Sequence, residues 1–247
     1  MTPAAMLKHA SILLVVVAGL WVTDPQAKPD VVTAEAPDVG SFQRLEVAGH
    51  ADLVLIQGDR EAVVVEAPAK AEARVRVRSN NGRLTIEVGD PAFRLWMGGP
   101  AEPTVIVYFR TLESLKTSGS IKVTAAAIVS PSLEIDASGA ATIRVDALKV
   151  DALRFRGSGA VKGEFAGTAI AQTVHISGAG SYRGSKLASD TAKVMVSGAG
   201  KVSVNAKIEL DASISGAGAI EYFGDPALRQ RVSGAGKITR RPAVTTS

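Results

Sequence analysis

A short unit, Ser-Gly followed by a small residue, recurs through the second half of the chain and constrains the fold more than any other feature. Its spacings are 20, 20, 19, 20, 18 and 18 residues. The copies begin at Ser118, Ser138, Ser158, Ser177, Ser197, Ser215 and Ser233, and the last four read Ser-Gly-Ala-Gly. Seven copies at a nearly constant spacing indicate a repeat architecture. Glycine suits a tight corner, because it adopts backbone dihedrals that other residues avoid.

The residues before each unit alternate between apolar and polar. The apolar ones stand five, three and one positions before the serine, as in Leu133, Ile135 and Ala137, or Leu210, Ala212 and Ile214. A period of two predicts a strand with one buried face. A second short strand follows each unit, as at 201–204. Two or three short strands with glycine corners in about 20 residues predict one coil of a parallel β-solenoid.

We therefore predict an all-β chain, a single-stranded parallel β-helix or solenoid with coils of about 18–20 residues and an irregular N-terminal strand region. Seven coils at a strand spacing of about 4.8 Å would form a rod about 30 Å long. A β-sandwich, which also has short strands at regular spacing, is the alternative. We favour the solenoid, because sandwich strands rarely carry the same corner sequence seven times.

The N-terminal half is less regular, and we interpret residues 39–112 as the first coils plus a cap. Residues 48–51, Ala-Gly-His-Ala, are a degenerate corner, and the Asn-Gly pair in 79–82 predicts a hairpin turn. The loop at 90–103 carries four large apolar side chains, Phe93, Leu95, Trp96 and Met97. We interpret this cluster as a cap over the open end of the solenoid, with a partner or membrane contact as the alternative.

The first 27 residues are predicted to be a signal peptide or N-terminal anchor. Lys8 and His9 precede an apolar run from Ala10 to Val22, which is short for a membrane span. A linker at 28–38, the solenoid at 113–239 and a disordered tail at 240–247 complete the predicted organisation. We expect an exported protein, periplasmic or on the cell surface, with no membrane span in the mature chain if the signal is cleaved. With no cysteine, it must be stabilised by packing alone.

Composition and charge argue against several functions. The net charge is +4, but no run of Lys or Arg exceeds two residues, so we expect no nucleic-acid partner. The absence of cysteine excludes thiolate sites, and three histidines make a multi-histidine metal site a poor interpretation. We predict no metal and no cofactor, and the sequence leaves the oligomeric state open.

Four segments carry a resemblance to a known family. They are residues 47–58 (Val-Ala-Gly-His-Ala-Asp-Leu-Val-Leu-Ile-Gln-Gly), residues 115–120 (Leu-Lys-Thr-Ser-Gly-Ser), the Ser-Gly-Ala-Gly repeats and residues 222–226 (Tyr-Phe-Gly-Asp-Pro). From about Phe42 to Ile238 the chain resembles the putative auto-transporter adhesin head domain, also called the head GIN domain, of bacterial envelope proteins. The resemblance implies a β-helical fold and an exported location, and it supplies no catalytic residues.

Equivalent positions of successive coils stack into columns in a solenoid. Two positions before each serine the column reads Lys116, Asp136, Arg156, His175, Met195, Ser213, Arg231, and four positions before it reads Ser114, Glu134, Arg154, Thr173, Lys193, Asp211, Arg229. We interpret the alternating charges in Lys116/Asp136/Arg156 and in Lys193/Asp211/Arg229 as structural ion ladders. His175 and His50 lack partners for a catalytic or metal role, and no serine has a plausible His–Asp arrangement.

The column four positions after each serine has a different pattern. It reads Lys122, Thr142, Lys162, Ser181, Lys201, Ala219, Lys237, so lysine occupies every second coil. This places ammonium groups about 10 Å apart, twice the strand spacing, along a line that suits an acidic polymer. The alternative interpretation is that these lysines only keep an exposed face soluble.

We predict an exported, non-enzymatic envelope protein that acts as a structural or adhesin-like binding module. Its partner would be an anionic polysaccharide, bound by Lys122, Lys162, Lys201 and Lys237, or another envelope protein. The alternative is a carbohydrate-active β-helical enzyme, a lyase or hydrolase, which would need acidic groups that converge in one groove. We predict no catalytic residues, and assembly through stacked ends or exposed edges is a third option.

Overall fold

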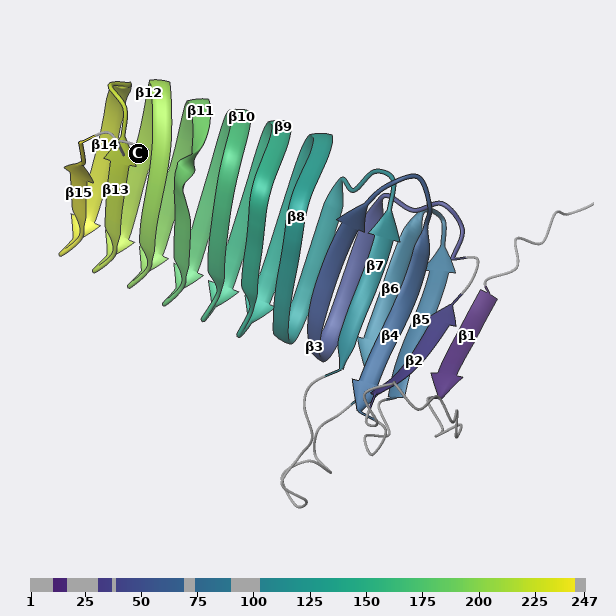
Figure 1. The fold of residues 1–247 in the computed structure, drawn as a ribbon. Helices are drawn as coiled ribbons and strands as arrows, with labels where there is room; N and C mark the ends of the chain where they lie inside the picture. Colours follow the sequence, from purple (N-terminus) through teal and green to yellow (C-terminus); the bar gives the residue numbers. More distant parts are fainter. Residues whose placement is uncertain (1–10, 17–30, 37–38, 69–73, 90–102, 243–247) are drawn as a thin grey trace, which may run out of the picture.

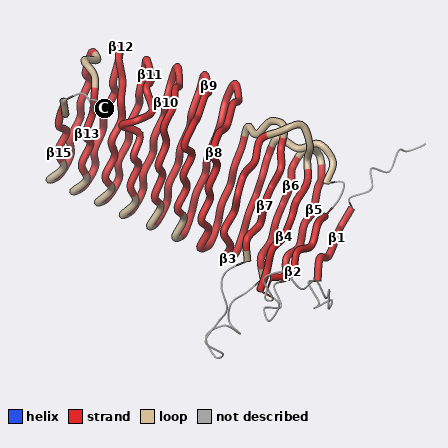
Figure 2. Tube along the Cα trace, viewed as in Figure 1, coloured by secondary structure: helices blue, strands red, loops and turns tan. Residues whose placement is uncertain are grey.

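The computed structural model describes residues 11–16, 31–36, 39–68, 74–89 and 103–242, and these residues form strands and turns with no helix. The strands stack into one long, coiled sheet (Figures 1 and 2). In chain order they are β1 (Ser11–Val16), β2 (Val31–Ala36), β3 (Arg44–Gln57), β4 (Ala62–Pro68), β5 (Arg74–Asn80), β6 (Arg83–Val88), β7 (Thr104–Phe109), β8 (Ser114–Gly139), β9 (Thr142–Gly159), β10 (Lys162–Gly178), β11 (Ser181–Gly198), β12 (Lys201–Gly216), β13 (Ala219–Phe223), β14 (Ala227–Gly234) and β15 (Lys237–Arg240).

Successive coils pair in parallel and keep the register that the repeat predicts. The repeat serines lie opposite one another, as Ser138 does with Ser158 and Ser158 with Ser177. The same register continues through β11, β12 and β14. The predicted parallel solenoid is therefore confirmed, and the sandwich alternative is wrong, because each strand pairs with the equivalent strand of the next coil.

One coil has three sides, which the burial pattern of β9 shows. Alternation of buried and exposed residues is interrupted twice by two adjacent exposed residues, at 146–147 and at 151–152. Each interruption is a corner, because a strand that continued straight would bury every second residue. The inward side chains are Ile143 and Val145, then Leu148 and Val150, then Leu153 and Phe155. We call the side before the Ser-Gly unit the pre-corner face and the side after it the post-corner face.

The Ser-Gly corner depends on backbone geometry that only glycine adopts at low cost. The first glycine of each repeat has a positive φ, for example 111° at Gly198. A Cβ atom added there would lie 2.7 Å from the carbonyl oxygen of Gly178 on the previous coil. Glycine thus permits both the turn and the close approach of neighbouring coils.

The two faces end differently at the N-terminal side of the solenoid. Along the pre-corner face β3 pairs in parallel with β6, which pairs antiparallel with β5, which pairs antiparallel with β1. Along the post-corner face β3 pairs in parallel with β7, and β4 and β2 follow in antiparallel pairs. Asn81 and Gly82 have positive φ between β5 and β6, which confirms the predicted hairpin turn. Strand β1 falls within the segment predicted as a signal peptide or anchor.

At the C-terminal side the coils shorten, and β14 and β15 form the last two strands. β14 pairs with β12 on the pre-corner face, and β15 pairs with β13 on the post-corner face. The backbone N–H of Arg241 donates to the carbonyl oxygen of Tyr222 at 2.8 Å. The described residues therefore continue past residue 239, into the segment that the sequence assigns to the tail. The described residues include no helix that could cross a membrane.

Candidate functional site

The lysine row lies on the post-corner face, where the repeat places it. Lys122 lies opposite Thr142, which lies opposite Lys162. The column continues through Ser181, Lys201, Ala219 and Lys237. All four lysines are exposed, and the residues between them are small and half-buried. The structure thus brings Lys122, Lys162, Lys201 and Lys237 into one line on alternate coils.

Main-chain hydrogen bonds to the preceding coil hold three of the four lysines of the row in place. The backbone N–H groups of Lys162, Lys201 and Lys237 donate to carbonyl oxygens of the preceding coil at 2.8, 3.0 and 3.1 Å. These bonds lie just after the Ser-Gly corner of each coil. The distance between successive Cα atoms of the row is therefore set by the distance between successive corners. Only the flexible side chains beyond Cα are free to adjust to a ligand.

None of the four lysines in the row forms an ion pair with a described residue. Among the described residues, lysine forms ion pairs only at Lys116 and Lys207. The next outward column on the post-corner face compensates its own charge, since Glu164 pairs with Arg183 and with Arg144, the latter at 3.9 Å. The unpaired positive charge on this part of the face therefore comes from the lysine row.

A second candidate is a shallow groove of about 700 Å³ on the pre-corner face. Its lining includes polar side chains two positions before the corner, Lys116, Asp136, Arg156 and His175, and a row of repeat serines. Glu46 continues the charged column onto β3, opposite Lys116. The column register is therefore the one that the sequence predicts, with a further member, Glu46, that the repeat pattern did not identify.

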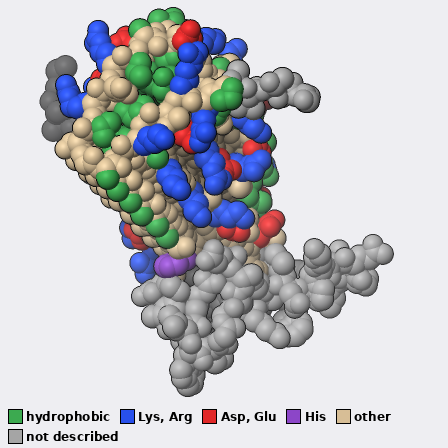
Figure 3. Space-filling view, turned by 90° about the vertical axis from the view of Figure 1, so that its left-hand side faces the viewer, with side chains coloured by type: hydrophobic (Ala, Val, Ile, Leu, Met, Phe, Trp, Pro, Cys, Tyr) green, Lys and Arg blue, Asp and Glu red, His purple; other side chains and the backbone are tan. Residues whose placement is uncertain are grey.

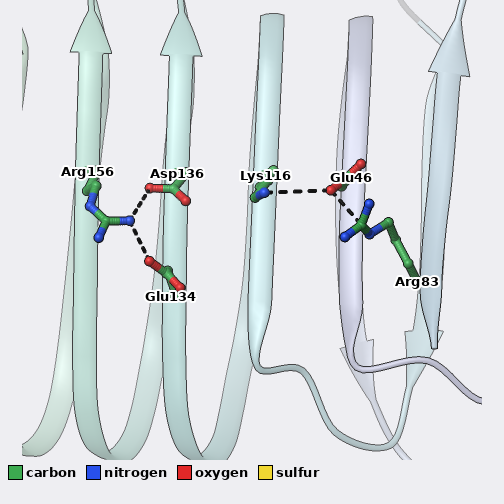
Figure 4. Close-up of polar contacts among 6 residues, drawn as sticks. All are labelled: Glu46, Arg83, Lys116, Glu134, Asp136 and Arg156. Carbon is green, nitrogen blue, oxygen red and sulfur yellow. Dashed lines mark hydrogen bonds and ion pairs between the residues drawn. The ribbon is translucent and has the colours of Figure 1, made fainter. Parts of the chain in front are cut away.

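The charges in the groove neutralise one another (Figure 4). Nη1 of Arg156 lies 3.1 Å from Oδ1 of Asp136 and also donates to Glu134. Glu46 lies between two cations, 3.8 Å from Nζ of Lys116 and 3.4 Å from Nε of Arg83. The hydrogen bond to Asp136 raises the pKa of Arg156, and Glu134 adds to this effect. This arrangement agrees with a structural ion ladder, since the acids face cations rather than an open site.

The second predicted ion ladder forms its column but not its expected ion pairs. Lys193 lies opposite Asp211, and Asp211 lies opposite Arg229. The ion pair of Arg229 is instead with Glu209, at 3.7 Å. The longer glutamate side chain reaches the arginine diagonally across the strands, and Lys193 has no ion pair with a described residue.

The histidines and acids do not assemble into a reactive group in the described part of the chain. His175 lies opposite Arg156 on one side and Met195 on the other. His50 stands at the degenerate corner, with a buried Nδ1 that has no hydrogen-bond partner. No three His, Asp or Glu residues among those described are close enough to hold a metal ion. The predicted cap cluster, Phe93, Leu95, Trp96 and Met97, lies outside the described residues.

Sequence reasoning missed a buried polar network inside coils β10–β12. The hydroxyl of Tyr182 donates to Oε1 of Gln172 at 3.0 Å, and Nε2 of Gln172 donates to Oγ of Ser189 at 2.7 Å. Ser189 donates in turn to the carbonyl oxygen of Asn205 at 2.7 Å. Burial raises the pKa of Tyr182. Alternation marks these positions as inward, but only the structure shows that the polar groups meet.

Known structures share this architecture at low sequence identity. A putative adhesin from Bacteroides fragilis superposes with a TM-score of 0.75 at 19% identity, over 86% of this chain and 96% of that one. A putative lipid binding protein from Parabacteroides distasonis has a TM-score of 0.66 at 19% identity, over 87% and 98%. A putative adhesin from Parabacteroides merdae has a TM-score of 0.65 at 20% identity, over 87% and 97%. At these identities the likeness establishes the fold alone.

A comparison with curated proteins gave no match. The sequence family described as "Putative auto-transporter adhesin, head GIN domain" matches residues 41–226, a range that runs from just before β3 to the turn before β14. This range includes the degenerate corner and the repeats up to Ser215, which carry the resemblance in the sequence. The chain therefore belongs to the head GIN domain family of putative auto-transporter adhesins.

Proposed function

We propose that the chain is an exported, non-enzymatic binding module of the cell envelope, and that its lysine row binds an anionic polysaccharide. The observation that carries the proposal is the column on the post-corner face, with exposed lysines on alternate coils and small residues between them. The family description, an adhesin head, supports a surface or periplasmic location. The charged N-terminal start and apolar run of the sequence support export.

The spacing suits a polymer better than a compact anion. Two steps of a β-ladder separate neighbouring lysines, which is about 10 Å, so a small anion contacts one or two ammonium groups at most. A chain with a carboxylate on many of its sugars can contact all four. Each exposed contact is weak, about 0–1 kcal/mol, and the sum over the row provides the affinity.

The alternative of a carbohydrate-active enzyme has weaker support. General acid–base hydrolysis of a sugar bond uses a pair of carboxyl groups that flank the scissile bond. Of the acids that line the groove, Asp136 lies against Arg156 together with its neighbour Glu134. The other acids of the lining, Glu46 and Glu87, have ion pairs with other cations. The positions of these acids therefore favour a structural role. Beside the lysine row, Asp52 lies opposite Lys122, and the described column from Lys122 to Lys237 itself contains no acid.

The test compares two charge-matched variants of the chain. In the first, Lys122, Lys162, Lys201 and Lys237 are replaced by Gln. In the second, four other exposed lysines, Lys149, Lys186, Lys193 and Lys207, are replaced by Gln. Both variants lose four positive charges, but only the first loses the row.

Binding to polygalacturonate, a polymer of carboxylated sugars, is measured by calorimetry at low and high salt. We expect the row variant to bind about tenfold more weakly or worse, and the control variant to stay within about twofold of the parent chain. Equal losses in the two variants would show that net charge alone drives binding, and no binding by the parent chain at low salt would refute the proposal.

A further inference from the structure

The C-terminal end of the solenoid is a strand edge with exposed apolar side chains. Along one edge β14 pairs with β12, and no described strand pairs with its other edge. Every residue of β14 is exposed. Leu228 and Val232, with exposed fractions of 36% and 44%, occupy columns in which Leu210 and Ile214 of the previous coil are buried. An edge of this kind is a template for pairing with another strand.

Positive charge surrounds this edge. Figure 3, which looks onto this end, shows Lys and Arg side chains beside hydrophobic ones, with fewer acidic side chains. The side chain of Arg229 is 80% exposed, and it has one ion pair, with Glu209. Arg231 is exposed and has no ion pair with a described residue. A partner that covers the edge must therefore bring negative charge.

The solenoid contains an internal example of acids that face arginines in the columns of Arg229 and Arg231. Arg154 and Arg156 in β9 occupy the same two columns as Arg229 and Arg231 in β14. On the preceding coil, the side that β12 occupies beside β14, Glu134 lies opposite Arg154 and Asp136 lies opposite Arg156. Side chains stack along a column in the same way on either side of a strand. Arg156 forms ion pairs with both acids. The acids alternate there with inward apolar residues, in the sequence Leu-Glu-Ile-Asp-Ala at 133–137.

We propose that the free edge of β14 binds an extended segment of a partner protein in which two acidic residues alternate with apolar ones. Main-chain hydrogen bonds to the edge would provide affinity, as in other cases of strand addition. The acidic residues would lie opposite Arg229 and Arg231, and the apolar residues would cover Leu228 and Val232. This surface is separate from the lysine row, so the proposal does not depend on polysaccharide binding.

Charge favours a partner protein over a second copy stacked end to end. Strand β5, near the opposite end, exposes Arg76 and Arg78, which share a single acid, Glu87. Strand β1, part of the predicted signal segment, pairs with the outer edge of β5. When that segment is removed, stacking the two ends would bring arginines toward arginines, which is unfavourable.

The test uses two labelled peptides and the full chain. The first peptide has the sequence of residues 132–139, Ser-Leu-Glu-Ile-Asp-Ala-Ser-Gly, and the second carries Lys in place of both acids. Fluorescence anisotropy measures their binding to the parent chain, to R229E/R231E and to a control, K149E/K186E, which reverses two exposed charges elsewhere. Circular dichroism confirms that each variant is folded.

We expect the acidic peptide to bind the parent chain and the control at least about tenfold more tightly than the basic peptide, and R229E/R231E to reverse that order. Equal binding of the two peptides, or an unchanged order in R229E/R231E, would overturn the proposal. So would a concentration-dependent dimer that R229E/R231E abolishes, because the occupant would then be a second copy. The four-lysine Gln variant is expected to bind the acidic peptide like the parent chain.

Discussion

A single corner glycine shows what the stacking of coils requires of one residue. At Gly198 the backbone has a φ of 111°, and the carbonyl oxygen of Gly178 occupies the space where a side chain would begin. The same relation links Gly216 to Gly198 and Gly234 to Gly216. These glycines form a column of their own along the solenoid, so a side chain at one of them disturbs two coils.

We expect Gly198→Ala to lower the free energy of unfolding by about 3 kcal/mol, because it combines a strained φ with a contact of 2.7 Å to backbone. The measurement is urea denaturation followed by circular dichroism. Gly58→Ala is the control, since a Cβ there has no atom within 4 Å and its φ is not positive. Similar stability of both variants would contradict this account of the corner.

The repeat pattern predicts which charged residues share a column, but it does not predict which ion pairs they form. The register of the repeats is enough to place Asp136 beside Arg156, because both stand two positions before a serine. The register does not specify which acid an exposed arginine selects. Arg229 pairs with Glu209 rather than Asp211, and Lys116 pairs with Glu46 of an irregular coil. Long side chains choose among several neighbours, and the free-energy differences between these choices are small.

At the scale of strands, coils β9–β11 are held by a core that differs from the aliphatic coils around it. The rings of Phe155, Phe165 and Tyr182 pack together, with centroids 5.3–5.5 Å apart. Gly163 and Gly184 leave room for these rings, since a Cβ on either would lie within 3 Å of an aromatic carbon. The tyrosine hydroxyl completes its hydrogen bonding through Gln172, so the strands are linked by polar as well as apolar contacts.

Because of Tyr182, the stability of these strands is expected to change with pH in the alkaline range. Burial raises the pKa of its hydroxyl above that of an unfolded tyrosine, which is about 10. The neutral form is therefore favoured in the fold, and this contribution is present below pH 10 and declines as the pH rises beyond it.

We expect Tyr182→Phe to be less stable than the parent chain by about 1 kcal/mol at pH 8, because a buried hydrogen bond is lost. At pH 11 ionisation of the unfolded tyrosine lowers the stability of the parent chain alone by about 1.4 kcal/mol, so the order reverses and Tyr182→Phe becomes slightly the more stable protein. Urea denaturation at both pH values measures the two differences. A difference that stays the same at pH 8 and pH 11 would contradict the burial of this hydroxyl.

The strands themselves could largely be predicted, and the packing inside them could not. Alternation predicted the strand that precedes each repeat serine, and it marked the inward residues of each repeat. Tyr182, Gln172 and Ser189 stand at inward positions as well. Nothing in a period of two shows that polar groups at three such positions meet. The nearest available indication is Gly163 and Gly184, glycines at inward positions close in sequence to large rings.

At the scale of the whole molecule, the solenoid converts a short repeat into long straight columns. The parallel register holds from Lys122 to Lys237, across six steps of the ladder, without a shift at the lysine column. The row therefore extends for about 30 Å. The sequence predicted this column because one rule, the distance from the serine, sets every member. The ends of the solenoid break that rule, and the exposed edge at β14 became apparent only from the structure.

The length of the row gives the most direct test of the proposed function. Oligogalacturonates of increasing length are titrated into the chain by calorimetry at low salt. We expect affinity to rise with each added sugar until the ligand is about 30 Å long and then to level off, because longer ligands gain no further lysine. Affinity that does not depend on length, or that stops rising at one or two sugars, would contradict a binding site made of four lysines in a line.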